Sequence, residues 1–358
     1  DFKDRPKQRG FDEVLQHGGG GITQNYPHCA DFPNNDYNNP YLLYNEKIIK
    51  EQGYCTDIFF DYAIDWIKKV NKDNKPFFVY LPTNVAHVPH IAPEEMQKAD
   101  DQIWRKINKK IMTNLDTNVG KLMTFLSKNK LDENTLVIYF TDNGAPGAKA
   151  KGLLGGKGKA SEGGIRVPCV FYWKGKIQNN GIEIDNLVGH MDLYRTFANL
   201  SGHPEKINST KSWGGKDMTP LLESSKSDLG KRYWIGHRAR WRNNAESAKY
   251  TEASIQDDTF KLYFKSETTF TLHNLKTDLG EKTDIKDKYP DKVAELKKQF
   301  DLFWADAKPF MINDNKEIPE THKPYHELFF ETYGEAAFIK AYDKQLQFDE
   351  AKKLKRKL

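Results

Sequence analysis

Apolar residues recur at three- and four-residue spacing from Thr56 onward, which predicts an amphipathic helix over residues 56–70. The same spacing predicts a long helix over 104–126 and a shorter one over 191–200, closed by Gly202. A further helix is predicted over 290–304, where Val293, Leu296 and Phe300 share one face.

Three continuous apolar runs, at 77–81, 136–140 and 167–172, predict strands buried on both faces. Their alternation with helices favours an α/β fold with a mostly parallel sheet sandwiched by helices. After about residue 225 the runs at 233–235 and 260–264 instead predict short strands of an antiparallel sheet.

This change of pattern predicts the domain organisation. We expect a main α/β domain over 1–225 and a small α+β subdomain over 226–312, in which a helix packs on an antiparallel sheet. Residues 313–358 are expected to form a C-terminal extension with a basic tail.

Composition places the chain among ordinary globular proteins. It has 358 residues, 38% hydrophobic and 29% charged, with a net charge of +5. No stretch approaches the roughly 18–20 apolar residues of a membrane helix, so no span is expected. The basic tail could contact nucleic acid or a membrane. A solvated chain end is favoured, so no nucleic-acid partner is expected. The three cysteines match no zinc-site spacing.

Polar residues follow two of the predicted strands, where ligands bind in doubly wound folds. Asp142 and Asn143 come directly after 136–140, and their side-chain oxygens suit Ca²⁺ or Mg²⁺. By itself, Asp-Asn-Gly is also a common turn signal. His87 follows 77–81, and a lone histidine is more often structural than catalytic.

A glycine-rich segment at 155–168 contains Lys157. Glycines allow close backbone approach to an anion, and lysine supplies a point charge for oxyanions. The segment is not a phosphate-binding P-loop, because Lys157 is followed by Gly158 and not by Ser or Thr. A flexible loop is the alternative interpretation.

Together, these segments resemble the sulfatase family within the alkaline-phosphatase-like superfamily. The resemblance covers nearly the whole chain, and the order and spacing of its short motifs are specific. The motifs lie at 9–13, 18–21, 53–57, 76–81, 87–89, 115–120, 134–137, 141–144, 156–158, 162–168, 190–193, 272–275 and 279–282.

The resemblance implies a hydrolase that removes sulfate from an aryl or carbohydrate sulfate ester. Asp142 and Asn143 would be two ligands of Ca²⁺, with Mg²⁺ as the second choice. Lys157 would contact the sulfate and the bridging oxygen, and His87 would bind sulfate or assist departure of the alcohol. Such fixed cations would meet the charge that develops on the sulfate and leaving oxygens.

Four further residues are candidates for substrate contact. His17 lies beside the glycine run at 18–21, where a structural role is favoured, and His90 lies on the predicted loop after 77–81. His237 and Arg240 belong to a basic-aromatic cluster that could recognise a sugar or a second sulfate. Ordinary surface or interdomain packing is the alternative for this cluster.

The resemblance fails at the nucleophile. Sulfatases use a formylglycine made from Cys or Ser in a Cys/Ser-x-Pro-x-Arg motif, and the chain contains no such motif. The family's paired metal-binding aspartates are also absent. We therefore expect an N-terminally truncated chain, with formylglycine upstream, that is inactive and poorly stable alone. The resemblance implies a periplasmic or extracellular location; the oligomeric state is not readable.

Two other functions stay open. Phosphatases and phosphodiesterases of the same superfamily usually hold two zinc ions and carry histidine where Asn143 stands, so Asn143 favours a single hard cation. A non-catalytic protein that binds sulfated glycans is supported by the missing nucleophile. The retained site residues argue against it. A Cys/Ser-x-Pro-x-Arg motif upstream of Asp1 in the gene would establish the enzyme.

Overall fold

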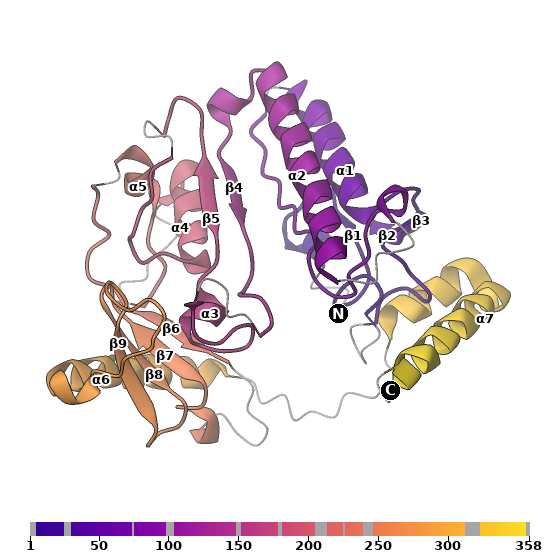
Figure 1. Ribbon diagram of the computed structural model, residues 1–358. Coiled ribbons are helices and arrows are strands. Elements are labelled where there is room, and N and C mark those ends of the chain that lie inside the picture. Colours follow the sequence, from indigo (N-terminus) through magenta and orange to yellow (C-terminus); the bar gives the residue numbers. More distant parts are fainter. Residues whose placement is uncertain are drawn as a thin grey trace. The chain divides into compact units, whose positions relative to one another are not determined.

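The computed structural model describes residues 5–24, 30–73, 75–97, 104–147, 152–177, 181–204, 213–224, 226–238, 246–311 and 323–355. The chain forms two compact units, Asp1–Lys130 with Glu317–Leu358, and Leu131–Lys316. We call these unit 1 and unit 2 and describe each by itself (Figure 1). The structural division falls at residue 130, whereas the predicted domain boundary was at 225.

Unit 1 contains a small antiparallel sheet and two long helices. Strands β1 (Leu15–Gln16), β2 (Tyr41–Tyr44) and β3 (Lys47–Lys50) pair in that order. The helices α1 (Cys55–Asn71) and α2 (Trp104–Lys128) confirm the predictions from periodicity. The short 3-10 helices are η2 (Pro6–Arg9) and η3 (Glu94–Met96).

A buried polar clamp joins α1 to α2. The Asp57 carboxylate on α1 accepts hydrogen bonds from the side-chain amides of Asn114 and Asn118 on α2. Both asparagines are buried, so their hydrogen bonds to Asp57 satisfy groups that would otherwise lose water without compensation. The clamp therefore fixes the register between these two helices.

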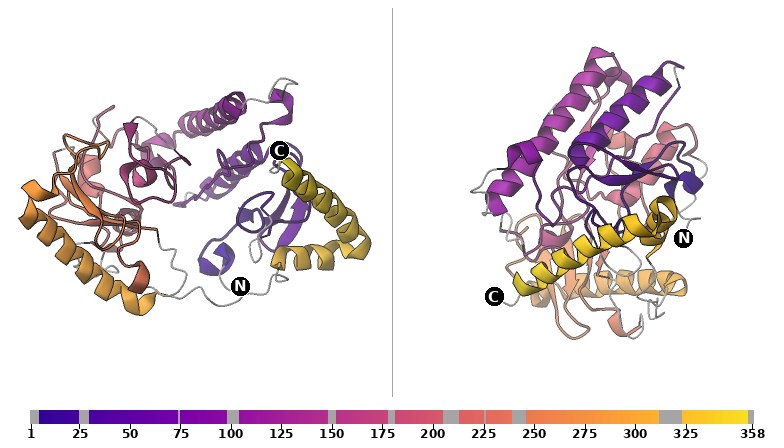
Figure 2. Two further views of the ribbon diagram at one scale, coloured as in Figure 1. Left: turned by 60° about the horizontal axis from the view of Figure 1, so that its bottom comes forward. Right: turned by 90° about the vertical axis from the view of Figure 1, so that its right-hand side faces the viewer.

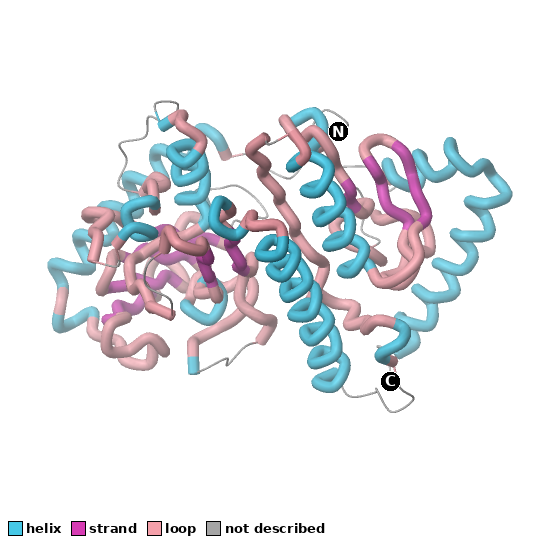
Figure 3. The backbone as a smooth tube through the Cα atoms, turned by 90° about the horizontal axis from the view of Figure 1, so that it is seen from above, coloured by secondary structure: helices cyan, strands magenta, loops and turns pink. Residues whose placement is uncertain are grey.

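The C-terminal residues fold back onto unit 1 as α7 (Pro324–Lys355), which bends at Gly334, where φ is 80°. Figure 3 shows this bend at the right-hand edge of the view, where two helical pieces meet. Phe329 packs with Phe32 and Leu43 in one buried cluster, and the ring of Tyr41 meets Phe329 edge-on at 5.2 Å. Much of the expected basic extension at 313–358 is thus a helix with its own core contacts; residues 312–322 lie outside the described residues.

The first part of unit 2 holds an antiparallel strand pair, β4 (Val137–Phe140) and β5 (Cys169–Tyr172), seen side by side in Figure 1. Around it lie three helices and one 3-10 turn: α3 (Glu162–Ile165), α4 (His190–Leu200), α5 (Thr219–Glu223) and η4 (Asp132–Asn134).

The pairing direction differs from the expectation of a mostly parallel sheet. Every strand pair in the described part of the chain is antiparallel. Residues 77–81, predicted as a buried strand, form none, and Phe78 and Tyr80 are 53% and 63% exposed. A continuous apolar run signals faces that favour burial, but it carries no information about strand direction or partner.

The rest of unit 2 is the expected antiparallel sheet with a packing helix. Strands β6 (Trp234–His237), β7 (Ala253–Gln256), β8 (Phe260–Phe264) and β9 (Phe270–Asn274) pair in chain order. Helix α6 (Pro290–Ala307) covers one face of this sheet (Figure 2), which confirms the helix predicted over 290–304. Leu296, Phe300 and Trp304 are fully buried against it. Three 3-10 turns flank these elements: η7 (Glu246–Ala248), η8 (Lys286–Lys288) and η9 (Lys308–Phe310).

Candidate functional site

The end of β4 presents two adjacent oxygen-bearing side chains. Thr141 Oγ1 donates to Asp142 Oδ1 at 3.3 Å, and Asn143 Nδ2 donates to Asp142 Oδ2. The second bond uses the amide nitrogen of Asn143 and leaves its carbonyl oxygen beside the exposed Asp142 carboxylate. The structure thus places both predicted metal ligands together, with oxygen atoms available to a cation.

Gly144 joins this strand end to the glycine-rich segment. Its backbone N–H donates to Gly164 O at 3.0 Å, and a Cβ on Gly144 would lie 1.9 Å from Gly163 O. No side chain fits in that space, so the glycine of Asp-Asn-Gly is required by close backbone approach. The turn signal in the sequence did not reveal this contact.

Lys157 lies on the glycine-rich segment, which is hydrogen-bonded to the end of β4. Its backbone N–H donates to Ala145 O at 3.1 Å, three residues after Asp142, while Gly163 N–H donates to Leu154 O at 2.8 Å. The Lys157 side chain is exposed and has no ion pair with any residue that the structure describes. Backbone hydrogen bonds in unit 2 therefore connect the two candidate cation ligands, Asp142 and Asn143, to the loop that carries Lys157.

His87 and His90 lie on one loop of unit 1. His87 is exposed; its backbone N–H donates to Asn84 O, and its Nδ1 lies 2.7 Å from Val88 O. Burial, together with the nearby His87, lowers the pKa of His90. Gln24 Nε2 donates to Val88 O at 3.2 Å and ties this loop to the residues after the glycine run.

The glycine run itself folds around Asp31, which sequence reasoning did not single out. Gly18 N–H and Thr23 N–H donate to the two Asp31 oxygens at 3.0 and 2.9 Å. Asp31 is 1% exposed, and burial raises its pKa to about 7. His17 Nδ1 lies 2.9 Å from Gly18 O, and burial lowers the pKa of His17. His17 is thus held against its own loop, and its substrate contact stays a prediction.

His237 is engaged in packing. Its ring lies 5.1 Å from the ring of Trp304 on α6, and its Nε2 lies 3.1 Å from Ala248 O. Burial lowers the pKa of His237. His237 therefore packs within unit 2, and its substrate contact stays a prediction. Arg240 lies outside the described residues, so its predicted substrate contact stays a prediction.

The donor set fits part of a calcium site. Among the residues that the structure describes, no group of three or more His, Cys, Asp or Glu side chains is placed to hold a metal ion. Asp142 and Asn143 offer hard oxygen atoms, the ligand type of Ca²⁺, which takes six to eight of them. These two residues therefore supply a ligand pair and not a full coordination sphere.

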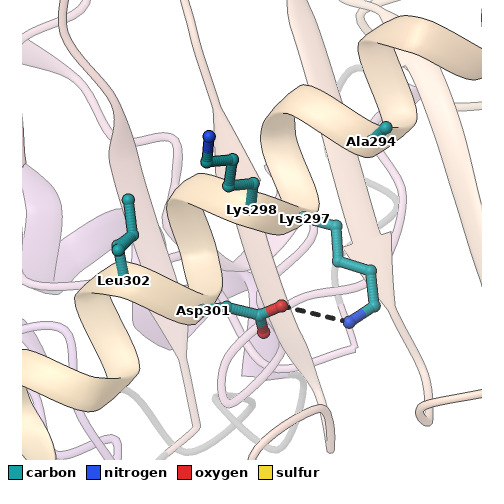
Figure 4. Close-up of a pocket in the computed structure, with 5 residues that line it drawn as sticks. All are labelled: Ala294, Lys297, Lys298, Asp301 and Leu302. Carbon is teal, nitrogen blue, oxygen red and sulfur yellow. Dashed lines mark hydrogen bonds and ion pairs between the residues drawn. The ribbon is translucent and has the colours of Figure 1, made fainter.

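One surface hollow lies in the described part of unit 2. A shallow hollow of about 450 Å³ lies along α6 (Figure 4), lined by Ala294, Lys297, Lys298, Asp301 and Leu302. Two of its charged groups pair with each other, since Lys297 Nζ lies 3.2 Å from Asp301 Oδ2. Within the described parts of the chain, no helix is both long and apolar enough to cross a bilayer.

Comparison with known proteins identifies the family. The family model described as Sulfatase matches residues 2–203, more than half of the chain. The chain therefore belongs to the sulfatase family.

Individual relatives agree. The chain is 29% identical to a sulfatase of Formosa agariphila over 279 residues, which cover 69% of the chain and 48% of that protein. It is 24% identical to the uncharacterized sulfatase YdeN of Escherichia coli, covering 87% of the chain and 59% of YdeN. The chain thus spans about half the length of these curated relatives.

Among solved structures, the chain is similar to that of Ps i-CgsB, with 28% identity and a TM-score of 0.71. The match covers 88% of this chain and 71% of that one. Ps i-CgsB has also been solved in complex with k-i-k-neocarrahexaose. The likeness confirms the alkaline-phosphatase-like α/β fold class.

Proposed function

We propose that this chain supplies the cation- and sulfate-binding part of the active site of a sulfuric ester hydrolase that acts on a sulfated saccharide. Membership of the sulfatase family supports the reaction class. The saccharide is supported by the similar structure of Ps i-CgsB, which was solved with k-i-k-neocarrahexaose. An aryl sulfate is the simpler alternative substrate.

One observation supports the proposal: in unit 2, backbone hydrogen bonds join the segment of the candidate ligands Asp142 and Asn143 to the loop that carries Lys157. The bonds Gly144 N–H to Gly164 O and Lys157 N–H to Ala145 O connect the end of β4 to the glycine-rich loop. These bonds fix the backbone from which the two groups project, and preorganised charges meet a developing oxyanion with less reorganisation.

The roles follow from the side-chain chemistry. Asp142 and Asn143 would hold Ca²⁺, with Mg²⁺ as the alternative. When bound, the ion would offset negative charge on the sulfate oxygens. Lys157 would hold the bridging oxygen with its ammonium group, and His87 would contact the sulfate or give a proton to the departing alcohol. Each lost donor of this kind would cost about 10²–10³ in rate.

The nucleophile is not among these residues. Formylglycine needs a Cys/Ser-x-Pro-x-Arg motif, which the 358 residues do not contain. We therefore expect the chain by itself to bind a sulfated saccharide without hydrolysing it. Calcium-dependent cleavage of an aryl sulfate by the purified chain would contradict this expectation.

Binding is the measurement that tests the proposal. Galactose 6-sulfate, galactose 6-phosphate and galactose are titrated into the chain by calorimetry, with Ca²⁺ present. We expect the sulfate to bind best, and Lys157→Met to weaken it about tenfold, the equivalent of ~1.4 kcal/mol. Lys176→Met, at an exposed lysine of the same unit, is the control and should change nothing.

The other outcomes discriminate between functions. Tighter binding of the phosphate would favour a phosphatase or phosphodiesterase. Equal binding of all three sugars would contradict the proposed sulfate-binding site. We also propose an exported location, periplasmic or extracellular, which fractionation of the source cells would test.

A further inference from the structure

Unit 2 contains a buried charge cluster that the proposed function does not use. It consists of Glu162 on α3, Lys261 on β8 and Glu281 in the turn after β9. Lys261 is 0% exposed, Glu162 1% and Glu281 4%. None of the three can therefore contact a substrate directly.

The contacts fix Glu162 at both its side chain and its backbone. Lys261 Nζ lies 2.9 Å from Glu162 Oε1 and 3.2 Å from Glu281 Oε1. Arg166 Nε donates to the other Glu162 oxygen, and the backbone N–H of Glu162 donates to Glu281 Oε2 at 2.7 Å. Burial opposes ionisation of Glu162, but Lys261 and Arg166 outweigh it and lower its pKa.

A buried ion cluster is by itself weak evidence of a gain in stability. Desolvating charges costs several kcal/mol for each ion, and replacing a buried ion pair by apolar residues is often neutral or stabilising. What a buried pair supplies is one defined geometry, because the charges have no other partner at that depth.

The buried charge cluster holds the loop that carries Lys157. Glu162 lies five residues after Lys157, and the next residue, Gly163, donates its N–H to Leu154 O at 2.8 Å across the loop. On the sheet side, Ser254 Oγ on β7 donates to Ala160 O at 2.9 Å. The loop is thus attached to β7 and β8 on one side and to the end of β4 on the other.

We propose that Lys261 and Glu281 are positioning residues, which act through Glu162 to hold the Lys157 ammonium group where it meets the sulfate. The antiparallel sheet after residue 225 then sets the geometry of the anion site. This inference rests on the proposed function for the role of Lys157, but its structural part can be measured without any ligand.

Glu281→Gln is the informative variant, because it keeps the side-chain shape and removes one charge of the cluster. Hydrogen exchange on the ligand-free chain is the first readout. Amides at 154–164 should exchange about tenfold faster, whereas those of β8 and β9 should change much less, as expected for local opening. Glu295→Gln is the matched control, since Glu295 is a partly exposed carboxylate paired with Lys231 and Lys292; it should leave the loop unchanged.

The second readout is a double-mutant cycle on binding of galactose 6-sulfate. Glu281→Gln should weaken binding several-fold in the natural background and add nothing in the Lys157→Met background, because it acts only through Lys157. A merely structural residue would weaken both backgrounds equally.

The outcomes separate the two claims. If Lys157→Met has no effect on binding, the proposed function fails, whatever the exchange data show. If Lys157→Met weakens binding while Glu281→Gln leaves loop exchange unchanged, the positioning role is wrong. Additive effects in the cycle, or equal acceleration of exchange throughout unit 2, would also overturn it.

Discussion

Replacing Arg232 by Met should destabilise unit 2 strongly. Arg232 is 1% exposed and binds the fully buried Asp192 of α4 through two hydrogen bonds, Nη1 to Oδ2 at 3.0 Å and Nη2 to Oδ1 at 2.8 Å. Nη1 also donates to Leu187 O at 3.0 Å. Met fills a similar volume without charge, so the variant removes the cation together with its hydrogen bonds to Asp192 and Leu187 and leaves little cavity.

The loss of unfolding free energy depends on the hydrogen bonds that Asp192 keeps in the variant. Removing one partner of a buried ion pair typically costs about 3–5 kcal/mol, because the other charge stays buried and unpaired. Here Asp192 would still accept backbone hydrogen bonds from Gly189 N–H at 2.8 Å and Lys216 N–H at 2.6 Å. We therefore expect the low end, about 3 kcal/mol.

Urea unfolding of the full chain measures this loss through tryptophan fluorescence, with Trp234 and Trp304 both in unit 2. Lys231→Met is the control, because the neighbouring Lys231 is 68% exposed in its pair with Glu295. Its loss should cost less than about 1 kcal/mol. Equal, small effects of Arg232→Met and Lys231→Met would refute the reasoning that burial decides the cost.

Three further predictions concern unfolding. Gly144→Ala should cost about 3 kcal/mol or prevent folding, since its Cβ would lie 1.9 Å from Gly163 O; a melting midpoint within a degree of the parent would contradict the close approach. Phe300→Ala, at a fully buried ring of α6, should cost about 3–5 kcal/mol in urea unfolding, and a loss under about 1 kcal/mol would argue against that packing. Burial raises the pKa of Asp31 from 3.8 to about 7 and lowers that of His326 from 6.5 to about 4. Between these values folded Asp31 keeps a proton that the unfolded chain releases, so its contribution to stability falls as pH rises from about 4 to about 7. Folded His326 lacks a proton that the unfolded chain holds, so its contribution rises from about pH 4 to 6.5. Asp31→Asn should therefore remove the contribution that falls with pH, and His326→Phe the contribution that rises with pH. Identical profiles of unfolding free energy against pH for the two variants would contradict these pKa shifts.

The sequence was informative where the physical signal is local. Apolar spacing of three and four residues predicted α1 and α6, because an amphipathic helix needs only its own period and one face to bury. Strand direction was not predictable, since β4 and β5 are separated by 28 residues along the chain and pair through the backbone. The run at 77–81 has strand composition but forms no strand, because pairing depends on a partner.

In the candidate site, too, local sequence patterns were informative and contacts between distant residues were not predictable. Asp142 and Asn143 were predicted as ligands because they directly follow a strand, and Lys157 as a sulfate contact because it stands in a glycine-rich segment, each with the family resemblance. The contacts of Glu162 with Lys261 and Glu281 were not predictable, since these pairs are 99 and 119 residues apart in the sequence. Similarly, no local pattern distinguishes the buried Asp31 from an exposed turn carboxylate.

The most direct test of the proposed cation and sulfate site is calcium-dependent binding of galactose 6-sulfate by the chain and by Asp142→Ala. We predict that chelating Ca²⁺ and the substitution each weaken binding about tenfold, ~1.4 kcal/mol, and that chelation has no further effect on the variant. Binding that is unchanged by both chelation and Asp142→Ala would contradict the account.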